Sequence, residues 1–319
     1  MDIKEISEAI ERHITSLDIP ARPAGLYEPV RYALAGGGKR LRPLLCVQSC
    51  IACGGSAADA MDAAMALEMF HNFTLVHDDI MDHSPMRRGR PSVAARYGEN
   101  QAILSGDAML TLASRLASKA PAAVAPRVLA EFNEMALRVY EGQQLDTEFE
   151  SRKDVTLEEY FEMISLKTGA LLASACRIGA MIGGADEATV EALGRYGMEL
   201  GLAFQLRDDW LDTFGDATTF GKPIGGDILN EKETWLLITA RSESRGALDA
   251  ILEEDLEDAE KVAQVTRLYN RLGVGERCDV AAAEHHALAV EALNDATFAR
   301  PELRAFFVHT VNRMASRSI

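Results

Sequence analysis

Two long segments, residues 58–82 and 188–213, most constrain the fold, because both are apolar around most of their circumference. A helix with that pattern is typically buried among other helices. Elsewhere apolar residues recur at intervals of three and four, as in Ile3, Ile6 and Ile10. This is the period of an amphipathic helix, and runs with the two-residue alternation of strands are nearly absent. The pattern predicts an all-α fold of roughly ten or more helices.

Glycine- and proline-rich breaks separate these helical stretches. They include "AGGG" (35–38), "CGGSA" (53–57), "HSPMRRGRP" (83–91), "IGGADE" (182–187) and "FGDATTFGKPIGGD" (214–227). No composition shift marks a linker, and no repeat of fixed period is present. We therefore expect residues 1–319 to form a single domain.

The charge balance excludes several classes of function. The chain has 33 Lys+Arg against 49 Asp+Glu, a formal net charge of −16. This field has the wrong sign for binding nucleic acid or anionic lipid. The first residues, "MDIKEISEAIERH", are a charged amphipathic pattern unlike a secretory leader, and no segment has the apolar length of a membrane span. We expect a cytoplasmic protein with no nucleic-acid partner and no stable membrane insertion.

The motif D-D-x-x-D occurs twice, each time at the end of a long apolar segment. Its carboxylates are Asp78, Asp79 and Asp82 in the first copy and Asp208, Asp209 and Asp212 in the second. Residues i and i+4 lie on one side of a helix, where like charges repel, and acid at a helix C-terminus opposes the helix dipole. Carboxylates on one face suit Mg²⁺. A solvated acidic surface is the alternative, and the duplication disfavours it.

Basic residues gather beside the glycine-rich breaks and the acidic motifs. They are Lys39, Arg40 and Arg42 in "GGGKRLRP", Arg87 and Arg88 after the first motif, Lys167 in "SLKTGA", and Lys222 and Lys232 after the second motif. In an acidic chain this association predicts two pockets for phosphate groups, which arginine grips in a bidentate manner and lysine attracts as a point charge. "GGGKRLRP" does not match a nucleotide-binding P-loop. His71 precedes Asp78 by two helical turns and is either a phosphate donor or a core histidine.

These motifs, in this order, resemble those of the trans-isoprenyl diphosphate synthases (polyprenyl synthetases). The matching motifs are "GGGKRLRP", "DDIMDHSPMRRGRPS", "SGDAML", "SLKTGAL", "FQLRDDWLD" and "GKPIGGDI", and the match spans about residues 36–235. The resemblance implies an all-helical isoprenoid synthase fold with a deep central cavity between the two aspartate-rich helices, in a homodimer. It also implies head-to-tail condensation of isopentenyl diphosphate with an allylic diphosphate.

Site residues follow from the same resemblance. It implies three Mg²⁺ ions, two held by Asp78 and Asp82 and the third by Asp208, with Asp79, Asp209 and Asp212 in support. The allylic diphosphate is assigned to Arg87, Lys167, Thr168, Gln205, Lys222 and Lys232. Isopentenyl diphosphate is assigned to Lys39, Arg42, His71 and Arg88, with Arg40 nearby. The catalytic set is then Asp78, Asp82, Asp208, Lys167 and Lys222.

The charges of these groups give the expected mechanism. Mg²⁺ and the lysines neutralise the allylic diphosphate as it departs, and an allylic carbocation forms. The double bond of isopentenyl diphosphate attacks this cation, and a proton is lost. No side chain near the motifs is an evident base, and the resemblance implies that the released diphosphate takes the proton.

Bulky residues before the first motif are candidates for a floor that limits product length. On an ideal helix Thr74 and Phe70 lie closer in direction to Asp78 than Phe73 does, so geometry favours Phe70. The resemblance instead points to Phe73, whose aromatic ring beside a small residue is typical of geranylgeranyl-type synthases. The alternative is that both rings are plain core aromatics. We predict a C20 product, with C15 next.

Three other functions remain open at this stage. A medium-chain polyprenyl diphosphate synthase would share every motif. A terpene cyclase also uses an aspartate-rich helix end, but normally carries a different second metal motif. A non-catalytic subunit of a heteromeric synthase usually has a degraded aspartate motif, whereas both are intact in this chain.

Overall fold

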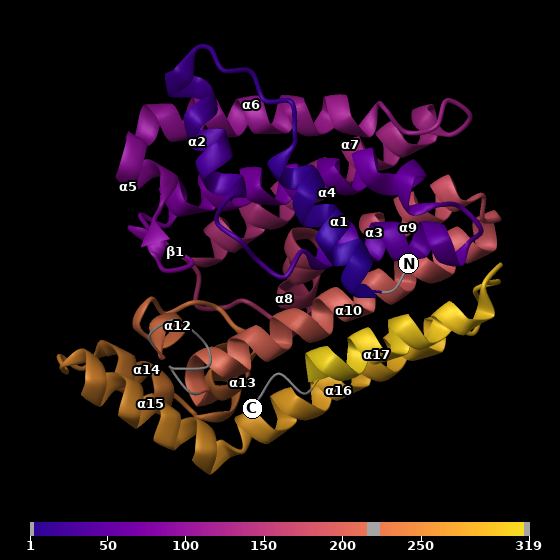
Figure 1. Ribbon diagram of the computed structural model, residues 1–319. Helices are drawn as coiled ribbons and strands as arrows, with labels where there is room; N and C mark the ends of the chain where they lie inside the picture. Colours follow the sequence, from indigo (N-terminus) through magenta and orange to yellow (C-terminus); the bar gives the residue numbers. More distant parts are fainter. Residues whose placement is uncertain (1–2, 216–223, 316–319) are drawn as a thin grey trace. The chain divides into compact units, whose positions relative to one another are not determined.

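The computed structural model describes residues 3–215 and 224–315 (Figure 1). Its first helices are α1 (Ile3–Thr15), α2 (Ala24–Leu34), α3 (Leu41–Ala52), α4 (Ala57–Met81), α5 (Val93–Tyr97), α6 (Glu99–Ala117), α7 (Ala125–Phe149) and α8 (Leu157–Ile164). The later ones are α9 (Ala170–Gly183), α10 (Glu187–Phe214), α12 (Gly226–Leu229), α13 (Trp235–Glu243), α14 (Ala247–Glu253), α15 (Asp258–Leu272), α16 (Val274–Ala292) and α17 (Arg304–Ala315). A π-helical turn, Ser165–Gly169, joins α8 to α9, and a 3-10 turn, Pro301–Leu303, precedes α17.

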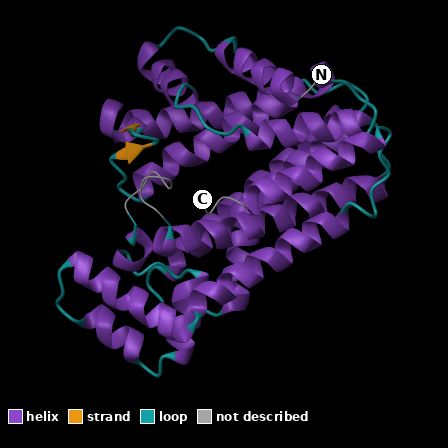
Figure 2. Cartoon of the chain, turned by 60° about the horizontal axis from the view of Figure 1, so that its bottom comes forward, coloured by secondary structure: helices purple, strands orange, loops and turns teal. Residues whose placement is uncertain are grey.

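The all-α prediction is confirmed. Within the described ranges the strands are β1 (Met86–Arg87) and β2 (Arg90–Pro91), which pair as a short antiparallel hairpin (Figure 2). The expected buried segments 58–82 and 188–213 appear as α4 and α10. None of the described helices combines the length and the apolar character needed to cross a bilayer.

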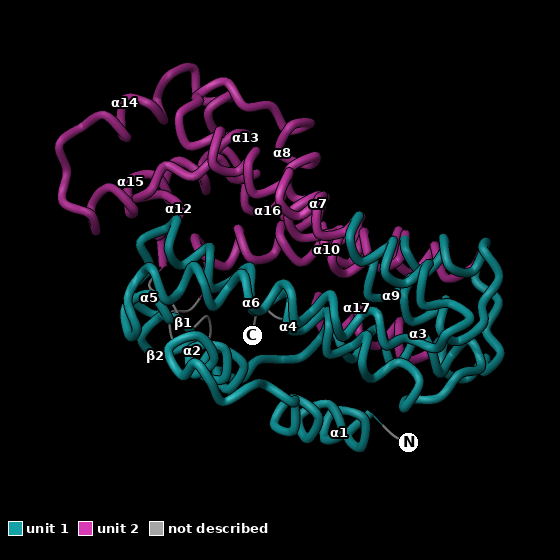
Figure 3. Tube along the Cα trace, turned by 90° about the horizontal axis from the view of Figure 1, so that it is seen from above, with its two compact units in different colours: residues 1–134, 174–194, 296–304 teal, residues 135–173, 195–295, 305–319 magenta. Residues whose placement is uncertain are grey.

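The chain divides into two compact units, which Figure 3 shows in different colours. Unit 1 contains residues 1–134, 174–194 and 296–304, and unit 2 contains residues 135–173, 195–295 and 305–319. Each aspartate motif lies wholly within one unit, the first in unit 1 and the second in unit 2.

Helix α4 is the centre of unit 1, where it packs against α1, α2, α3, α5 and α6. It begins with a capping box, in which Ser56 Oγ accepts from the backbone N of Asp59 and the Asp59 carboxylate accepts from Ser56 N at 3.1 Å. Its middle is buried on every side, as its sequence predicts. It ends at Met81 and is capped by Asp82, whose backbone N donates to the carbonyl of Asp78 at 2.8 Å. The first aspartate motif is thus the C-terminal turn of a buried helix.

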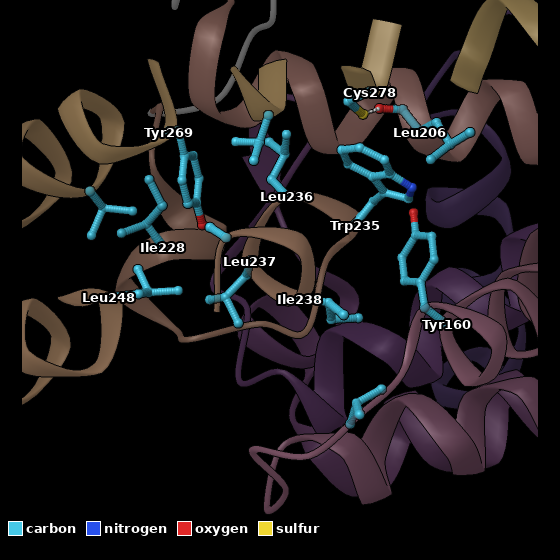
Figure 4. Packing of buried hydrophobic residues seen from close by; sticks show 14 of the residues in the cluster. Tyr160, Leu206, Ile228, Trp235, Leu236, Leu237, Ile238, Leu248, Tyr269 and Cys278 are labelled. Atoms are coloured by element: carbon cyan, nitrogen blue, oxygen red, sulfur yellow. Dashed lines mark hydrogen bonds between the residues drawn. The ribbon is translucent and has the colours of Figure 1, made fainter. Parts of the chain in front are cut away.

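The core of unit 2 is built around α13, which contacts α8, α14, α15 and α16. Four consecutive residues of α13, from Trp235 to Ile238, are buried, so this short helix is enclosed on all sides. Figure 4 shows them packed with Leu206 of α10, Tyr269 of α15 and Cys278 of α16. This packing fixes the part of α10 that carries the second aspartate motif.

Candidate active site

The first motif places its three carboxylates in different environments. Asp82 is exposed at the end of α4, Asp78 is half-buried, and only 3% of Asp79 is exposed. One Asp79 oxygen, Oδ1, accepts from Arg87 Nε at 2.9 Å and from Arg87 Nη2 at 2.6 Å. Asp79 therefore anchors Arg87, while Asp78 and Asp82 lie nearer to solvent.

The β1–β2 hairpin returns Arg87 and Arg88 toward the end of α4. Arg87 pairs with Arg90 across the hairpin, and Arg88 has a φ of 51° at its turn. Arg88 Nη1 donates to the carbonyl of Gly37, and a Cβ placed on Gly38 would lie 3.0 Å from the Arg88 guanidinium. Glycine at position 38 thus allows this close approach, which brings the "GGGKR" break and the hairpin together. A pocket beside the hairpin is lined by Asp79, Arg87 and Arg88 among others.

A buried basic cluster lies beside the first motif. Arg40 is buried and donates to three acceptors, Glu11 at 2.9 Å, Glu68 at 2.5 Å and the carbonyl of Leu34 at 2.9 Å. Burial opposes its charge, but the ion pairs with Glu68 and Glu11 outweigh burial and leave the pKa of Arg40 above its usual value. Arg40 is held within the protein, whereas Lys39 is exposed.

Arg42 and His71 complete this cluster. Arg42 Nε is buried and has no hydrogen-bond acceptor in the protein, and burial lowers the pKa of Arg42 to about 10 despite the nearby Glu68 carboxylate. Burial also lowers the pKa of His71 well below its usual value, and the charges of Arg42, Arg88, Arg87 and Arg40 lower it further. His71 is therefore a neutral imidazole among guanidinium groups. An anion-binding site requires positive charge and hydrogen-bond donors that have no acceptor within the protein, and this cluster has both.

In the second motif, Asp209 is held as firmly as Asp79. It is 3% exposed, and its carboxylate accepts from Tyr160 OH at 2.6 Å, Gln205 Nε2 at 2.9 Å and the backbone N of Trp235 at 3.4 Å. The last contact places Asp209 at the N-terminus of α13, where the helix dipole favours an anion. Burial nevertheless raises the pKa of Asp209 to about 6, an effect that the Tyr160 and Gln205 hydrogen bonds oppose.

The other aspartates of unit 2 lie nearby. Asp208 is half-buried. Asp212 Oδ2 accepts from the backbone N of Asp227 at 2.9 Å, which ties α10 to α12. Burial raises the pKa of the Asp227 carboxyl to about 7, although Lys232 opposes the shift.

The π-helical turn presents Lys167 and Thr168. Thr168 Oγ1 donates to Gln205 Oε1 at 3.1 Å, and through Gln205 it is linked to Asp209. Lys167 donates to Asp146 Oδ2, and Lys232 Nζ lies 3.8 Å from the same oxygen. The structure thus brings together four of the residues predicted for one diphosphate, Lys167, Thr168, Gln205 and Lys232. Lys222 lies outside the described residues.

The candidate floor residues lie in the interior of unit 1. Phe70 is fully buried and 6% of Phe73 is exposed, with 5.5 Å between their ring centroids. Phe70 also meets the edge of Phe132 from α7 at 5.7 Å. Thr74 is half-buried, and its hydroxyl donates to the carbonyl of His71 at 2.9 Å. The assignment of a floor stays a prediction.

The sequence did not point to four polar residues, Glu68 in unit 1 and Asp146, Tyr160 and Asp227 in unit 2. Glu68 had a signal, because a lone acid inside the apolar run "MALEMFHNF" requires a buried partner. Asp146 follows Gly142 by one turn, and a glycine inside a helix often marks close packing. Asp227 lies in the quoted motif "GKPIGGDI", whereas Tyr160 carries no local signal, since its partner Asp209 is distant in sequence.

This chain is similar to known proteins over most of its length. The Polyprenyl synthetase family model matches residues 23–271. A short chain isoprenyl diphosphate synthase from Methanothermobacter thermautotrophicus is 38% identical over 299 residues, covering 92% of this chain and 91% of that protein. A geranylfarnesyl diphosphate synthase from Natronomonas pharaonis is 37% identical over 284 residues, 83% of each chain. A crystal structure of a geranylgeranyl pyrophosphate synthase has a TM-score of 0.94 and 39% identity, covering 100% of both chains.

This chain belongs to the polyprenyl synthetase family of prenyltransferases, which confirms the resemblance drawn from its motifs.

Proposed function

We propose that this protein condenses isopentenyl diphosphate head-to-tail with allylic diphosphates of C5 to C15 in an Mg²⁺-dependent reaction. The favoured product is a C20 all-trans prenyl diphosphate, with C15 next. Family membership supports the reaction class. The names of the similar proteins support products of geranylgeranyl length or one isoprene unit more.

The observation that carries the proposal is the buried basic cluster of unit 1. The charges of the buried Arg40, the half-buried Arg42 and the exposed Arg88 all act on the neutral His71, and Glu68 is the buried carboxylate that opposes them. Arg42 Nε lacks an acceptor within the protein. Gathering cations out of water is unfavourable unless an anion joins them. A diphosphate would supply both the charge and the missing acceptors, so we assign isopentenyl diphosphate to Lys39, Arg42, His71 and Arg88.

The aspartates fit Mg²⁺ in their donor chemistry, because the ion prefers carboxylate oxygens, waters and phosphate oxygens. We propose Asp78 and Asp82 for two ions and Asp208 for a third. Asp79 and Asp209, which are held by Arg87 and Tyr160, support the helix ends. Among the described residues no three acidic, histidine or cysteine side chains form a ready-made ion site. Bound Mg²⁺ would withdraw charge from the departing diphosphate.

The remaining side chains act by binding and orientation. Lys167, Lys232 and Arg87 supply positive charge to the allylic diphosphate, where negative charge grows as the carbon–oxygen bond breaks. Thr168 and Gln205 are hydrogen-bonded to each other at 3.1 Å and are assigned to orient the same group. The apolar residues of α4 that precede Asp78 would exclude water from the allylic cation. Lys222 is assigned to the allylic diphosphate by family resemblance.

The test uses purified protein with Mg²⁺, radiolabelled isopentenyl diphosphate and C5, C10 or C15 allylic primers, with products dephosphorylated and sized. We expect incorporation with each primer and a C20 main product. A lack of incorporation with every primer would overturn the proposal. A homodimer, also proposed from family resemblance, is tested by light scattering on the same sample.

A further inference from the structure

We propose that Asp146 is a positioning residue, which holds the ammonium groups of Lys167 and Lys232 together for contact with the diphosphate leaving group. This inference rests on the proposed function, because that function assigns both lysines to the allylic diphosphate. Lys167 donates to Asp146 Oδ2, and Lys232 Nζ lies 3.8 Å from the same oxygen. Two lysines that share one carboxylate oxygen must have their ammonium groups within a few ångströms of each other.

The packing of α7 explains why Asp146 reaches this position. Gly142, one helical turn earlier, lies against the π-helical turn: a Cβ placed on it would be 2.3 Å from the backbone N of Lys167. It would also lie 2.8 Å from the carbonyl carbon of Leu166. Only a residue without a side chain allows the two backbones to approach so closely. The contact at Gly142 therefore sets the distance between Asp146 and Lys167.

The burial of the three side chains indicates that Asp146 supports the two lysines from within the protein and is not part of a surface ion pair. The Asp146 side chain is 13% exposed, whereas the side chains of Lys167 and Lys232 are 25% and 41% exposed. Burial alone would raise the pKa of Asp146, but the charges of Lys232 and Lys167 outweigh it and hold the pKa below its usual value. Asp146 is thus an anion at neutral pH, beneath two cations that are closer to solvent.

The charges also indicate what Asp146 contributes. Two lysines and one aspartate have a net charge of +1, so the group still attracts a phosphate. Lys167 has three N–H donors and uses one on Asp146, which leaves others able to face a second acceptor. Without the aspartate the two ammonium groups would repel and separate. Replacing it with a neutral residue therefore increases the net positive charge but removes the alignment.

A positioning residue aligns the two lysines, whereas a direct ligand contributes binding affinity. Asp146→Asn distinguishes the two roles, because it removes the charge with little change in side-chain shape. We expect kcat to fall about 10- to 100-fold, because misplaced groups lose transition-state contacts. The KM of the allylic diphosphate and the Kd of inorganic diphosphate with Mg²⁺ should stay unchanged or decrease. Asp146→Glu, which restores the charge, should recover part of kcat. Glu148→Gln is the matched control, because it removes an exposed carboxylate from the same helix, and it should behave as the wild type.

A second measurement does not depend on activity. In Asp146→Asn, acetylation of Lys167 and Lys232 by a water-soluble acetylating ester should be faster by about threefold or more, because each ammonium loses its counter-charge and meets the other's repulsion. Mass spectrometry measures the labelling, and Lys153, an exposed lysine paired with Glu253 at 3.2 Å, should be unaffected. Unchanged labelling overturns the positioning role even if the protein shows no synthase activity.

The kinetic outcomes are equally distinct. If wild-type protein is active and Asp146→Asn retains its kcat, the inference is wrong while the proposed function stands. A loss confined to KM or Kd would also overturn it, since that pattern belongs to a direct ligand. Inactive wild-type protein whose lysines respond to Asp146→Asn would instead contradict the proposed function alone.

Discussion

Asp79 and Asp209 occupy the same place in their motifs, and both are buried. Each is 3% exposed and hydrogen-bonded to side chains outside its own motif. The first aspartate of each motif, Asp78 or Asp208, is half-buried instead. A D-D pair on a helix points its two side chains about 100° apart, so one can face the protein while the other faces a ligand. The sequence treats the two as equivalent acids, and the structure places them in different environments.

This division predicts the effect of removing the first aspartates. Asp78→Ala and Asp208→Ala should each lower kcat/KM by about a thousandfold or more, because charge stabilisation at the leaving group is lost. Steady-state incorporation of radiolabelled isopentenyl diphosphate measures the effect. Asp62→Ala, on the same helix as Asp78, is the control and should retain activity. Full activity in either motif variant would refute the metal assignment.

Tyr160→Phe tests the support of the second motif. Tyr160 OH donates to the fully enclosed Asp209 carboxylate at 2.6 Å. Without this donor a buried charge is less satisfied, so we expect the free energy of unfolding to fall by about 1–3 kcal/mol. Urea unfolding provides the measurement, with Tyr97→Phe, at a half-buried tyrosine of α5, as the matched loss of a hydroxyl. Equal stability of the two variants would mean that Tyr160 does not support Asp209.

At the scale of the element, α4 places aromatic rings in a row before its aspartates. Phe73 lies between His77, at 4.8 Å between centroids, and Phe70, at 5.5 Å, and Phe70 continues to Phe132. If these rings limit product length, Phe73→Ala and Phe70→Ala should each lengthen the product, as chromatography of the dephosphorylated alcohols would show. Phe70→Ala should also destabilise the fold by about 3–5 kcal/mol, since its ring is fully buried. Unchanged product length in both variants would rule out the floor.

The two long buried helices could be predicted from the sequence to within one or two residues. Segment 58–82 became α4 (Ala57–Met81), because a long apolar pattern without glycine or proline has few alternatives. The π-helical turn at Ser165–Gly169 could not be predicted, since "SLKTG" continues a helical pattern and the extra residue is absorbed by contacts with α7 and α10. The pairing of Asp146 with Lys167 likewise depends on packing between distant segments. Local patterns determine helices, whereas the partners of buried charges depend on tertiary contacts.

At the scale of the whole molecule, the acidic net charge and the basic clusters act over different distances. The net charge of −16 repels anions at long range, but salt screens that field beyond about 8 Å at physiological ionic strength. Each unit gathers its cations on buried carboxylates, Glu68 in unit 1 and Asp146 in unit 2, where screening is weak. A diphosphate therefore meets attraction only close to these clusters. The prediction that residues 1–319 form a single domain stays a prediction.

Buried ionisable groups also give the stability of the molecule an unusual pH dependence. In the folded protein the pKa values of Asp209 and Asp227 are raised to about 6 and about 7, while burial lowers those of His71 and His286. The raised carboxyls contribute stability that is complete below about pH 4 and is lost as pH rises through 6 to 7. The imidazoles, whose pKa values are lowered, contribute stability that is present above about pH 6.5 and is lost as pH falls. The two effects oppose each other between pH 5 and 6.5.

Asp227→Asn removes one of the two carboxyls with a raised pKa and so tests this pH dependence. At pH 8 the variant should be more stable than the wild type, because the wild type carries an unfavourable buried charge there. As pH falls from 7 to 5 the wild-type carboxyl takes up a proton in the folded state, so the variant should lose its advantage by roughly 1 kcal/mol per pH unit. Urea unfolding at pH 5, 6, 7 and 8 in EDTA measures the difference. Asp255→Asn, at an exposed aspartate, is the control, and its free energy of unfolding should change with pH as that of the wild type does. If the free energy of unfolding of Asp227→Asn also followed the wild type, Asp227 would be ionised across this pH range.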